Sequence, residues 1–336
     1  MIRLYPLTPM NFTPFDPRRP ARAFWAELGF GDVDDIAWLR DQGIVLTGSP
    51  ISADLFIASR YPFPKRRARW LLRILRWKPV LIWTDEPRFA TWFEPVVPAR
   101  AGLPSLHVMN IYTGDVLLSN TTCAGWTIHR RLDTFEEQAL PNDFNRGRQV
   151  VALATYRRNF AAQRLIGPQG NDIDLVIPRQ NLILAGYRMG MVDIYGRNWP
   201  KGVQTVGESR GGEWYKTKVD IMRRYRFNIC LENTSFPYYC SEKIWDSIRC
   251  GCLPIYHGAG NAIYEDFPPA SFLDSAAFDS PEGLFEAVRQ MGRQEYCERM
   301  NRCIDVYNRL YERGDFLRQR ERMLENTVKK VHELVN

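Results

Sequence analysis

The chain has 336 residues, of which 45% are hydrophobic and 25% are charged. This composition is typical of a soluble globular protein and argues against a disordered chain, and the length suits two domains better than one core. The formal net charge of +7 favours anionic partners, namely a nucleotide phosphate, a nucleic acid or an acidic membrane surface.

Cysteine and histidine usage argues against a disulfide framework and a zinc site. The seven cysteines are odd in number and none has CxxC spacing, and the four histidines are widely separated. The first twenty residues contain no apolar run of signal-peptide length. We therefore expect a cytoplasmic protein, and leave open a peripheral contact with the inner membrane surface.

The first half of the chain alternates strands and helices. Residues 53–60 and 79–87 are predicted strands, and residues 65–78, "KRRARWLLRILRWK", form a basic amphipathic helix between them. This order predicts a parallel sheet with crossover helices. Two interpretations of the helix are compatible: a crossover helix packed on the sheet, and a helix that touches a membrane surface.

The second half repeats the alternation after a polar, turn-rich segment, residues 132–149, which we interpret as a linker. Two α/β halves predict a cleft between an N-terminal domain, 1–145, and a C-terminal domain, 146–315, followed by a C-terminal helix, 316–336. The predicted strands are 149–156, 191–199, 226–233 and 252–258. The predicted helices are a helix start at 157–167, then 213–225, 241–251, 280–291 with Ser280 as N-cap, and one long helix over about 296–335.

Charged and polar side chains gather where the strand 226–233 ends and the helix 241–251 begins. Glu232 and Asn233 close the strand, and Ser241 can cap the helix that has Glu242 and Lys243 in its first turn. Ligands bind at the carboxyl ends of strands in open α/β sheets. With Tyr239, these residues could accept hydrogen bonds from a ribose diol and neutralise a phosphate. The alternative is that Glu242 only helps to cap the helix and Lys243 is a solvated surface charge.

The stretch "YRFNICLENTSFPYYCSEKIWDSIRCGCLPIYHG" resembles the signature region of the α-1,3-fucosyltransferases, glycosyltransferase family 10. The likeness is specific over about 190–275 and weaker over about 79–190. The matching positions are Tyr225, Arg226, Phe227, Glu232, Asn233, Thr234, Tyr239, Ser241, Glu242, Lys243, Ile244, Gly251, Pro254, Ile255 and Gly258.

The resemblance implies a GT-B fold, two Rossmann-like domains facing across a cleft with the donor on the C-terminal one. It implies transfer of L-fucose from GDP-β-L-fucose to a hydroxyl of an N-acetylglucosamine- or glucose-containing glycan, with inversion. Glu86 matches the proposed base, with Asp85 as its rival, and no metal or cofactor is expected. The implied donor contacts are Arg158 or Arg157 for the phosphate, Glu242 for the ribose, Lys243, Asn233, Tyr239, Arg226 and Glu232, with Tyr195 and Gly196 bordering the nucleotide.

The sequence also allows other interpretations, of which a degenerate, non-catalytic sugar-binding relative is disfavoured because the full charged set is present. A metal could bind "DID", residues 172–174, although this triplet lies away from the signature. A nucleic-acid-binding protein could use the net charge and the basic run, but no RNA-binding sheet motif is present. A related transferase could use another GDP-sugar, such as GDP-mannose, because the matching residues recognise the nucleotide more than the sugar.

Overall fold

The computed structural model describes residues 1–11, 13–16, 35–63, 66–100, 102–124, 127–140, 149–159, 164–209 and 214–336. Most of the predicted linker, residues 141–148, lies outside them. The chain divides into two compact units: a first unit of Met1–Thr122 with Leu317–Asn336, and a second unit of Cys123–Phe316. This division falls earlier than the predicted boundary near residue 145, and it assigns most of the last helix to the first unit.

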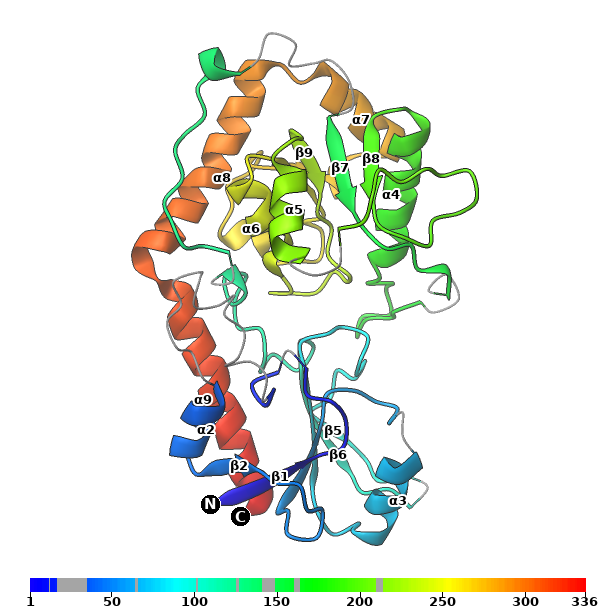
Figure 1. Ribbon diagram of the computed structural model, residues 1–336, viewed down its shortest axis with the longest axis vertical. Helices are drawn as coiled ribbons and strands as arrows, with labels where there is room; N and C mark the ends of the chain where they lie inside the picture. The colour runs from blue at the N-terminus through cyan, green and yellow to red at the C-terminus, as the bar shows by residue number, and fades with distance from the viewer. Residues whose placement is uncertain are drawn as a thin grey trace. The chain divides into compact units, whose positions relative to one another are not determined.

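The first unit is built on a mostly parallel sheet, whose described strands follow the order β2-β1-β3-β4-β6-β5 with only β5 antiparallel. Figure 1 labels β1, β2, β5 and β6 of this sheet. The strands are β1 Ile2–Pro6, β2 Ile44–Leu46, β3 Leu55–Ala58, β4 Val80–Thr84, β5 Val96–Val97 and β6 Leu106–Asn110, and the helices are α2 Asp35–Asp41, α3 Arg66–Ile74 and α9 Asp315–Val335. The predicted strand–helix–strand order of 53–87 is confirmed. The central strand β1 was missed, because its five residues contain no continuous apolar run.

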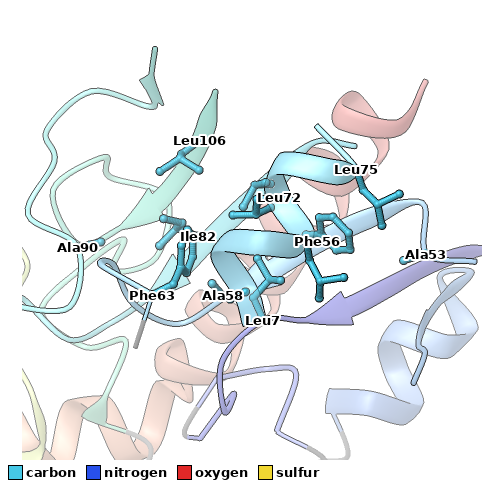
Figure 2. Packing of buried hydrophobic residues seen from close by; sticks show 13 residues of the cluster. Leu7, Ala53, Phe56, Ala58, Phe63, Leu72, Leu75, Ile82, Ala90 and Leu106 are labelled. Atoms are coloured by element: carbon cyan, nitrogen blue, oxygen red, sulfur yellow. The ribbon is translucent and has the colours of Figure 1, made fainter. Parts of the chain in front are cut away.

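Helix α3 covers one face of this sheet. Its buried Leu71 and Leu72 pack on Phe56 of β3 and Ile82 of β4 (Figure 2). Side chains alternate along a strand, so Trp83 points to the other face, where its indole Nε1 donates to Thr327 Oγ1 of α9 at 3.1 Å. Burial on both faces explains why all five residues of β4 are apolar or buried.

The second unit is a parallel sheet, with the described strands in the order β11-β10-β9-β7-β8. The strands are β7 Val150–Leu153, β8 Val192–Tyr195, β9 Phe227–Ile229, β10 Leu253–Tyr256 and β11 Leu273–Asp274, and the helices are α4 Val176–Arg188, α5 Trp214–Met222, α6 Glu242–Arg249, α7 Pro281–Gln290 and α8 Arg293–Arg313. Right-handed crossovers place α4 on one face and α5 and α6 on the other. Figure 1 shows α5 and α6 together in front of the strands, and α4 beside α7.

Two predicted helices differ from the structure. Of the helix start predicted at 157–167, residues 158–159 form a 3₁₀ turn, residues 160–163 lie outside the described residues and residues 164–167 are non-helical, and the α-helix α4 begins at Val176. The single helix over 296–335 is two helices, because Gly314 takes a left-handed conformation with φ of 61° and ends α8. The α/β class, with two units each built on a mostly parallel sheet, is confirmed, and the GT-B arrangement of two units facing across a cleft stays a prediction.

Leu72 is fully buried between α3 and the sheet, so its truncation tests the packing in Figure 2. We expect Leu72→Ala to lower the free energy of unfolding by about 2–5 kcal/mol, because it removes apolar contacts and leaves a cavity. Ile74 on the same helix is 47% exposed, and Ile74→Ala should change the free energy of unfolding by about 0.5 kcal/mol or less. Denaturant titration of both variants gives the comparison, and equal losses would contradict the packing.

Candidate active site

The order of the strands in the second unit defines where a ligand crevice forms. The chain runs from β7 outward to β8 and then returns to β9 on the other side of β7, so the direction of the strand order reverses between β7 and β9. Loops that leave the carboxyl ends of two such strands diverge and open a crevice. Arg157 and Arg158 follow β7, and Glu232 and Asn233 follow β9, so four predicted residues border this switch point.

Arg179, which the sequence analysis missed, lies in the first turn of α4 and reaches the end of β9. Its Nη1 donates to the carbonyl of Leu231 at 2.8 Å, and its Nη2 donates to Asn233 Oδ1 at 3.0 Å. Burial lowers the pKa of the guanidinium, although arginine stays protonated at any ordinary pH. The accepting oxygens are neutral, so they fix the guanidinium without cancelling its charge.

Glu232 ties the end of β9 to the start of α6. Its carboxylate is 1% exposed and accepts hydrogen bonds from the backbone N–H of Ser241 at 2.7 Å and from the Ser241 hydroxyl at 2.8 Å. Lys243 donates to the same carboxylate at 2.7 Å. Because its lone pairs are engaged, Glu232 acts inside the protein as a support, and the structure gives it no contact surface for a donor.

Ser241 occupies the predicted N-cap position of α6 but its side chain does not cap the helix. Its hydroxyl donates to Glu232 and accepts from Lys243 Nζ at 2.6 Å. Burial alone would lower the pKa of Lys243, but the negative charges of Glu232 and Glu242 outweigh burial and raise it. The lysine is therefore a fixed, ionised cation with a quarter of its side chain exposed, so the interpretation as a freely solvated charge is not supported.

Glu242 is held ionised by two lysines. Lys218 of α5, a second residue that the sequence analysis missed, lies 3.4 Å from Glu242 Oε1 and 2.5 Å from Asp246 Oδ2. Burial alone would raise the pKa of Glu242, but the charges of Lys218 and Lys243 outweigh it and lower the pKa to about 2. With 26% of its side chain exposed, this carboxylate can still accept hydrogen bonds from a ligand.

Asn233 and Tyr239 complete the cluster around the switch point. The amide oxygen of Asn233 accepts a hydrogen bond from Arg179. Its amide nitrogen, Nδ2, lies 3.5 Å from the hydroxyl of the buried Tyr239. Arg157 and Arg158 are both exposed, and the backbone N–H of Arg157 donates to Gln180 Oε1 at 2.5 Å. The structure therefore brings the predicted residues of the β7 and β9 loops to one edge, together with Arg179.

The side chains of two predicted donor residues, Arg226 and Tyr195, do not join this cluster, whereas Gly196 follows the carboxyl end of β8 and lies beside the β7 loop. Arg226 precedes β9, so it lies at the amino end of that strand, the opposite edge of the sheet from Glu232 and Asn233. Tyr195 is buried in the core under α5, with its hydroxyl 3.3 Å from that of Tyr225. At Gly196, with φ of 144°, a Cβ would lie 2.1 Å from the carbonyl oxygen of Ala154, so only glycine allows this approach of the two loops.

Glu86 belongs to the first unit and follows the carboxyl end of β4, as predicted. Its backbone N–H donates to Thr84 Oγ1 at 3.1 Å, and the residue is exposed whereas Asp85 is half-buried. This placement is at the ligand-binding edge of its own sheet. Its role as a base stays a prediction.

The aspartates of "DID" have structural partners. Asp172 accepts from Arg164 Nε at 3.0 Å, and Asp174 Oδ2 accepts from the backbone N–H of Ile177 in the first turn of α4 at 3.0 Å. Among the described residues, no group of three or more histidine, cysteine, aspartate or glutamate side chains is placed to hold a metal ion. Within the same residues, no helix is long and apolar enough to cross a bilayer.

Comparison with known families links the cluster to one of them. The family model described as glycosyltransferase family 10 (fucosyltransferase), C-terminal part, matches residues 179–306, a range that begins at Arg179 and contains Glu232, Glu242 and Lys243. Most of the cluster at the switch point therefore lies in the part of the chain that resembles this family.

Curated proteins match the chain over short stretches. An α-(1,4)-fucosyltransferase from Arabidopsis thaliana is 36% identical over 81 residues, 24% of this chain and 20% of its own length. The human 3-galactosyl-N-acetylglucosaminide 4-α-L-fucosyltransferase FUT3 is 29% identical over 107 residues, 30% of this chain and 26% of its own length. The matches thus span about a quarter or less of these relatives.

Two solved structures resemble the chain over most of its length. A crystal structure of an α1,3-fucosyltransferase with GDP-fucose has a TM-score of 0.45 and 15% identity, covering 89% of this chain and 81% of its own. A DNA-modifying β-glucosyltransferase has a TM-score of 0.46 and 8% identity, covering 98% of this chain and 99% of its own.

The lowered pKa of Glu242 predicts a pH dependence of stability. A carboxyl group whose pKa falls from 4.5 to about 2 on folding stabilises the folded state above pH 4.5 and loses that contribution as the pH falls toward 2. The full loss is about 3 kcal/mol. Glu242→Gln should therefore remove part of the wild-type destabilisation between about pH 5 and about pH 2, as measured by denaturant unfolding.

The exposed Glu208 supplies the matched control, because Glu208→Gln removes the same charge from the second unit outside the lysine cluster. We expect this variant to keep the pH dependence of the wild type. An identical pH profile for Glu242→Gln and the wild type would contradict the ion-pair assignment.

Proposed function

We propose that the protein transfers L-fucose from GDP-β-L-fucose to a hydroxyl of an N-acetylglucosamine- or glucose-containing glycan, with inversion at the anomeric carbon. The observation that carries the proposal is the pair of fixed cations, Arg179 and Lys243, beside the ionised Glu242 at the switch point, in the part of the chain that resembles family 10. The relatives that match the chain are α-fucosyltransferases, which supports fucose as the transferred sugar.

The cations suit the diphosphate of the donor. A departing GDP carries negative charge on its β-phosphate, and fixed donors that meet this charge stabilise the transition state because they need no reorganisation during the reaction. Arg179 presents a planar fork and Lys243 a point charge. Either Arg158 or Arg157, exposed at the end of β7, could add a third contact. With cations in this role, the proposed reaction needs no metal ion.

Glu242 suits the ribose of the nucleotide. A carboxylate accepts hydrogen bonds from both hydroxyls of a ribose diol, and its low pKa keeps it in the accepting form at neutral pH. Lys218 of α5 lies 3.4 Å from this carboxylate, and the charge of Lys243 helps to lower its pKa. In this proposal Asn233 and Tyr239, whose side chains lie 3.5 Å apart at the same edge, line the nucleotide pocket.

Glu86 is the proposed base. In a single displacement, its carboxylate takes the proton of the acceptor hydroxyl while the acceptor oxygen bonds to the anomeric carbon. The bond from that carbon to the β-phosphate oxygen breaks on the opposite face, and GDP leaves with the electron pair. A β-linked donor then gives an α-linked product. The exposed side chain at the carboxyl end of β4 is the observation that supports this role.

The roles of the cations can be separated by GDP binding, measured by calorimetry. Arg179→Gln should weaken GDP binding by about ten- to a hundredfold, because it removes a charge-assisted hydrogen bond to phosphate. Arg158→Gln should weaken it by about threefold or less, because an exposed, more loosely held cation contributes less. A larger loss for Arg158→Gln than for Arg179→Gln would show that the β7 loop, and not α4, holds the phosphate.

Transfer assays with GDP-fucose and GDP-mannose over a small panel of glycan acceptors test the reaction itself. We expect the wild type to transfer sugar from GDP-fucose only, and a chelator should not affect this activity. Glu86→Gln should lower kcat by about a hundred- to ten-thousandfold and leave the affinity for GDP unchanged. Asp85→Asn is the matched control and should retain most activity. Failure with GDP-fucose on every acceptor would overturn the proposal, and transfer from GDP-mannose would favour a related GDP-sugar transferase.

A further inference from the structure

The outer face of α3 combines exposed aromatic and aliphatic side chains with arginines. Trp70 is 60% exposed, Ile74 is 47% exposed, and Trp77, just beyond the helix end, is 70% exposed. Arginines surround them, and residues 66–78 contain no acidic residue. We define the α3 outer face as Arg66, Arg67, Arg69, Trp70, Arg73, Ile74, Arg76 and Trp77, all of which are exposed.

Packing on the sheet does not account for these apolar side chains. The opposite side of the helix, with the buried Ala68, Leu71, Leu72 and Leu75, already packs on β3 and β4 (Figure 2). Trp70 and Ile74 are one helical turn apart, so they form a stripe that points away from this core. Large exposed apolar groups gathered in one place mark an interaction surface.

A neighbouring turn extends the apolar part of this surface. The Lys78 ammonium at the end of the α3 segment donates to the carbonyl of Ile51 at 2.9 Å and also to the carbonyl of Ala53. Ile51 is thereby held close to the end of α3, and its side chain is 79% exposed. The nearby carboxylate of Asp54 is paired with Arg3 at 3.1 Å, so its charge is offset.

We infer that the α3 outer face binds the surface of a bilayer that contains anionic phospholipids. The arginines match the phosphate groups of the lipids in charge, and tryptophan favours the boundary between headgroups and acyl chains. Ile51 and Ile74 add buried apolar area on binding. A nucleic acid would also attract the arginines and could stack on the tryptophans, but it offers no partner for the two isoleucines. The bilayer therefore accounts for the whole surface.

Co-sedimentation of the full chain with vesicles tests this inference. We expect binding to vesicles of equimolar phosphatidylcholine and phosphatidylglycerol and at least tenfold weaker binding to phosphatidylcholine alone. The variant Trp70→Ser/Ile74→Ser/Trp77→Ser should lower the affinity for the mixed vesicles by about tenfold or more. Arg66→Gln/Arg67→Gln/Arg69→Gln/Arg73→Gln should have a similar effect, because both charge and insertion contribute.

Matched controls separate this surface from the general positive charge. Trp214→Ser alters an exposed tryptophan of the second unit, and Arg188→Gln/Arg223→Gln/Arg289→Gln/Arg309→Gln removes the same charge elsewhere; both should bind nearly as the wild type does. Bromine-labelled phosphatidylcholine added to the mixed vesicles should quench tryptophan fluorescence of the unaltered protein. This measurement does not depend on how well the variants fold, and Trp70→Phe/Trp77→Phe should abolish the quenching.

Three outcomes would overturn the inference. Equal losses for the four-arginine control and the α3 arginine variant would show non-specific electrostatics. Unchanged binding by the serine variant, or an absence of quenching, would show that the apolar side chains do not insert. Tighter binding to single-stranded RNA than to the anionic vesicles, lost in the same α3 variants, would assign the surface to a nucleic acid instead.

Discussion

The carboxylate of Glu232 is the constraint on which the candidate site depends. It stands where β9 ends, nearly inaccessible to water, and a lone buried carboxylate would be costly. The Ser241 backbone and hydroxyl and the Lys243 ammonium satisfy it, so the start of α6 is fixed to the end of β9. The loop between them is closed by one charged group. The lysine that would meet an anionic ligand is thereby held in place before the ligand arrives.

A second layer of charge surrounds this link. Lys218 from α5 forms ion pairs with Glu242 and Asp246, and Arg179 from α4 donates a hydrogen bond to the backbone carbonyl of Leu231, just beyond β9. Three helices from both faces of the sheet thus contribute to one edge. Such a site is rigid because each charge is oriented by partners on another element, which is the property that electrostatic stabilisation of a leaving group requires. The first unit supplies a different surface, α3, whose inner side belongs to the core and whose outer side does not.

The positions of the site residues could be predicted in part from sequence alone. Glu232, Asn233, Glu242 and Lys243 were placed at a strand end and a helix start because apolar runs and helix-start signals are local features. Arg179 and Lys218 were missed because their partners are distant in the sequence. The partners of Arg179 lie 52 to 54 residues away and those of Lys218 lie 24 to 28 residues away, separations that only folding closes. Helix α4, with Arg179 in its first turn, begins at Val176 and was not predicted, which is a second reason why Arg179 was missed.

The sequence by itself determined the α/β class, most of the strands and helices after residue 50, and the resemblance to family 10, because periodicity, capping residues and a contiguous motif are written along the chain. Only the tertiary structure decided which charged groups face a ligand and which face each other. Glu232 and Lys243 pair with one another, Arg226 lies at the far edge of the sheet, and Gly314 divides the last helix. The reason is physical: the partner of a charge is set by distance in space, and strand order, not chain order, sets that distance.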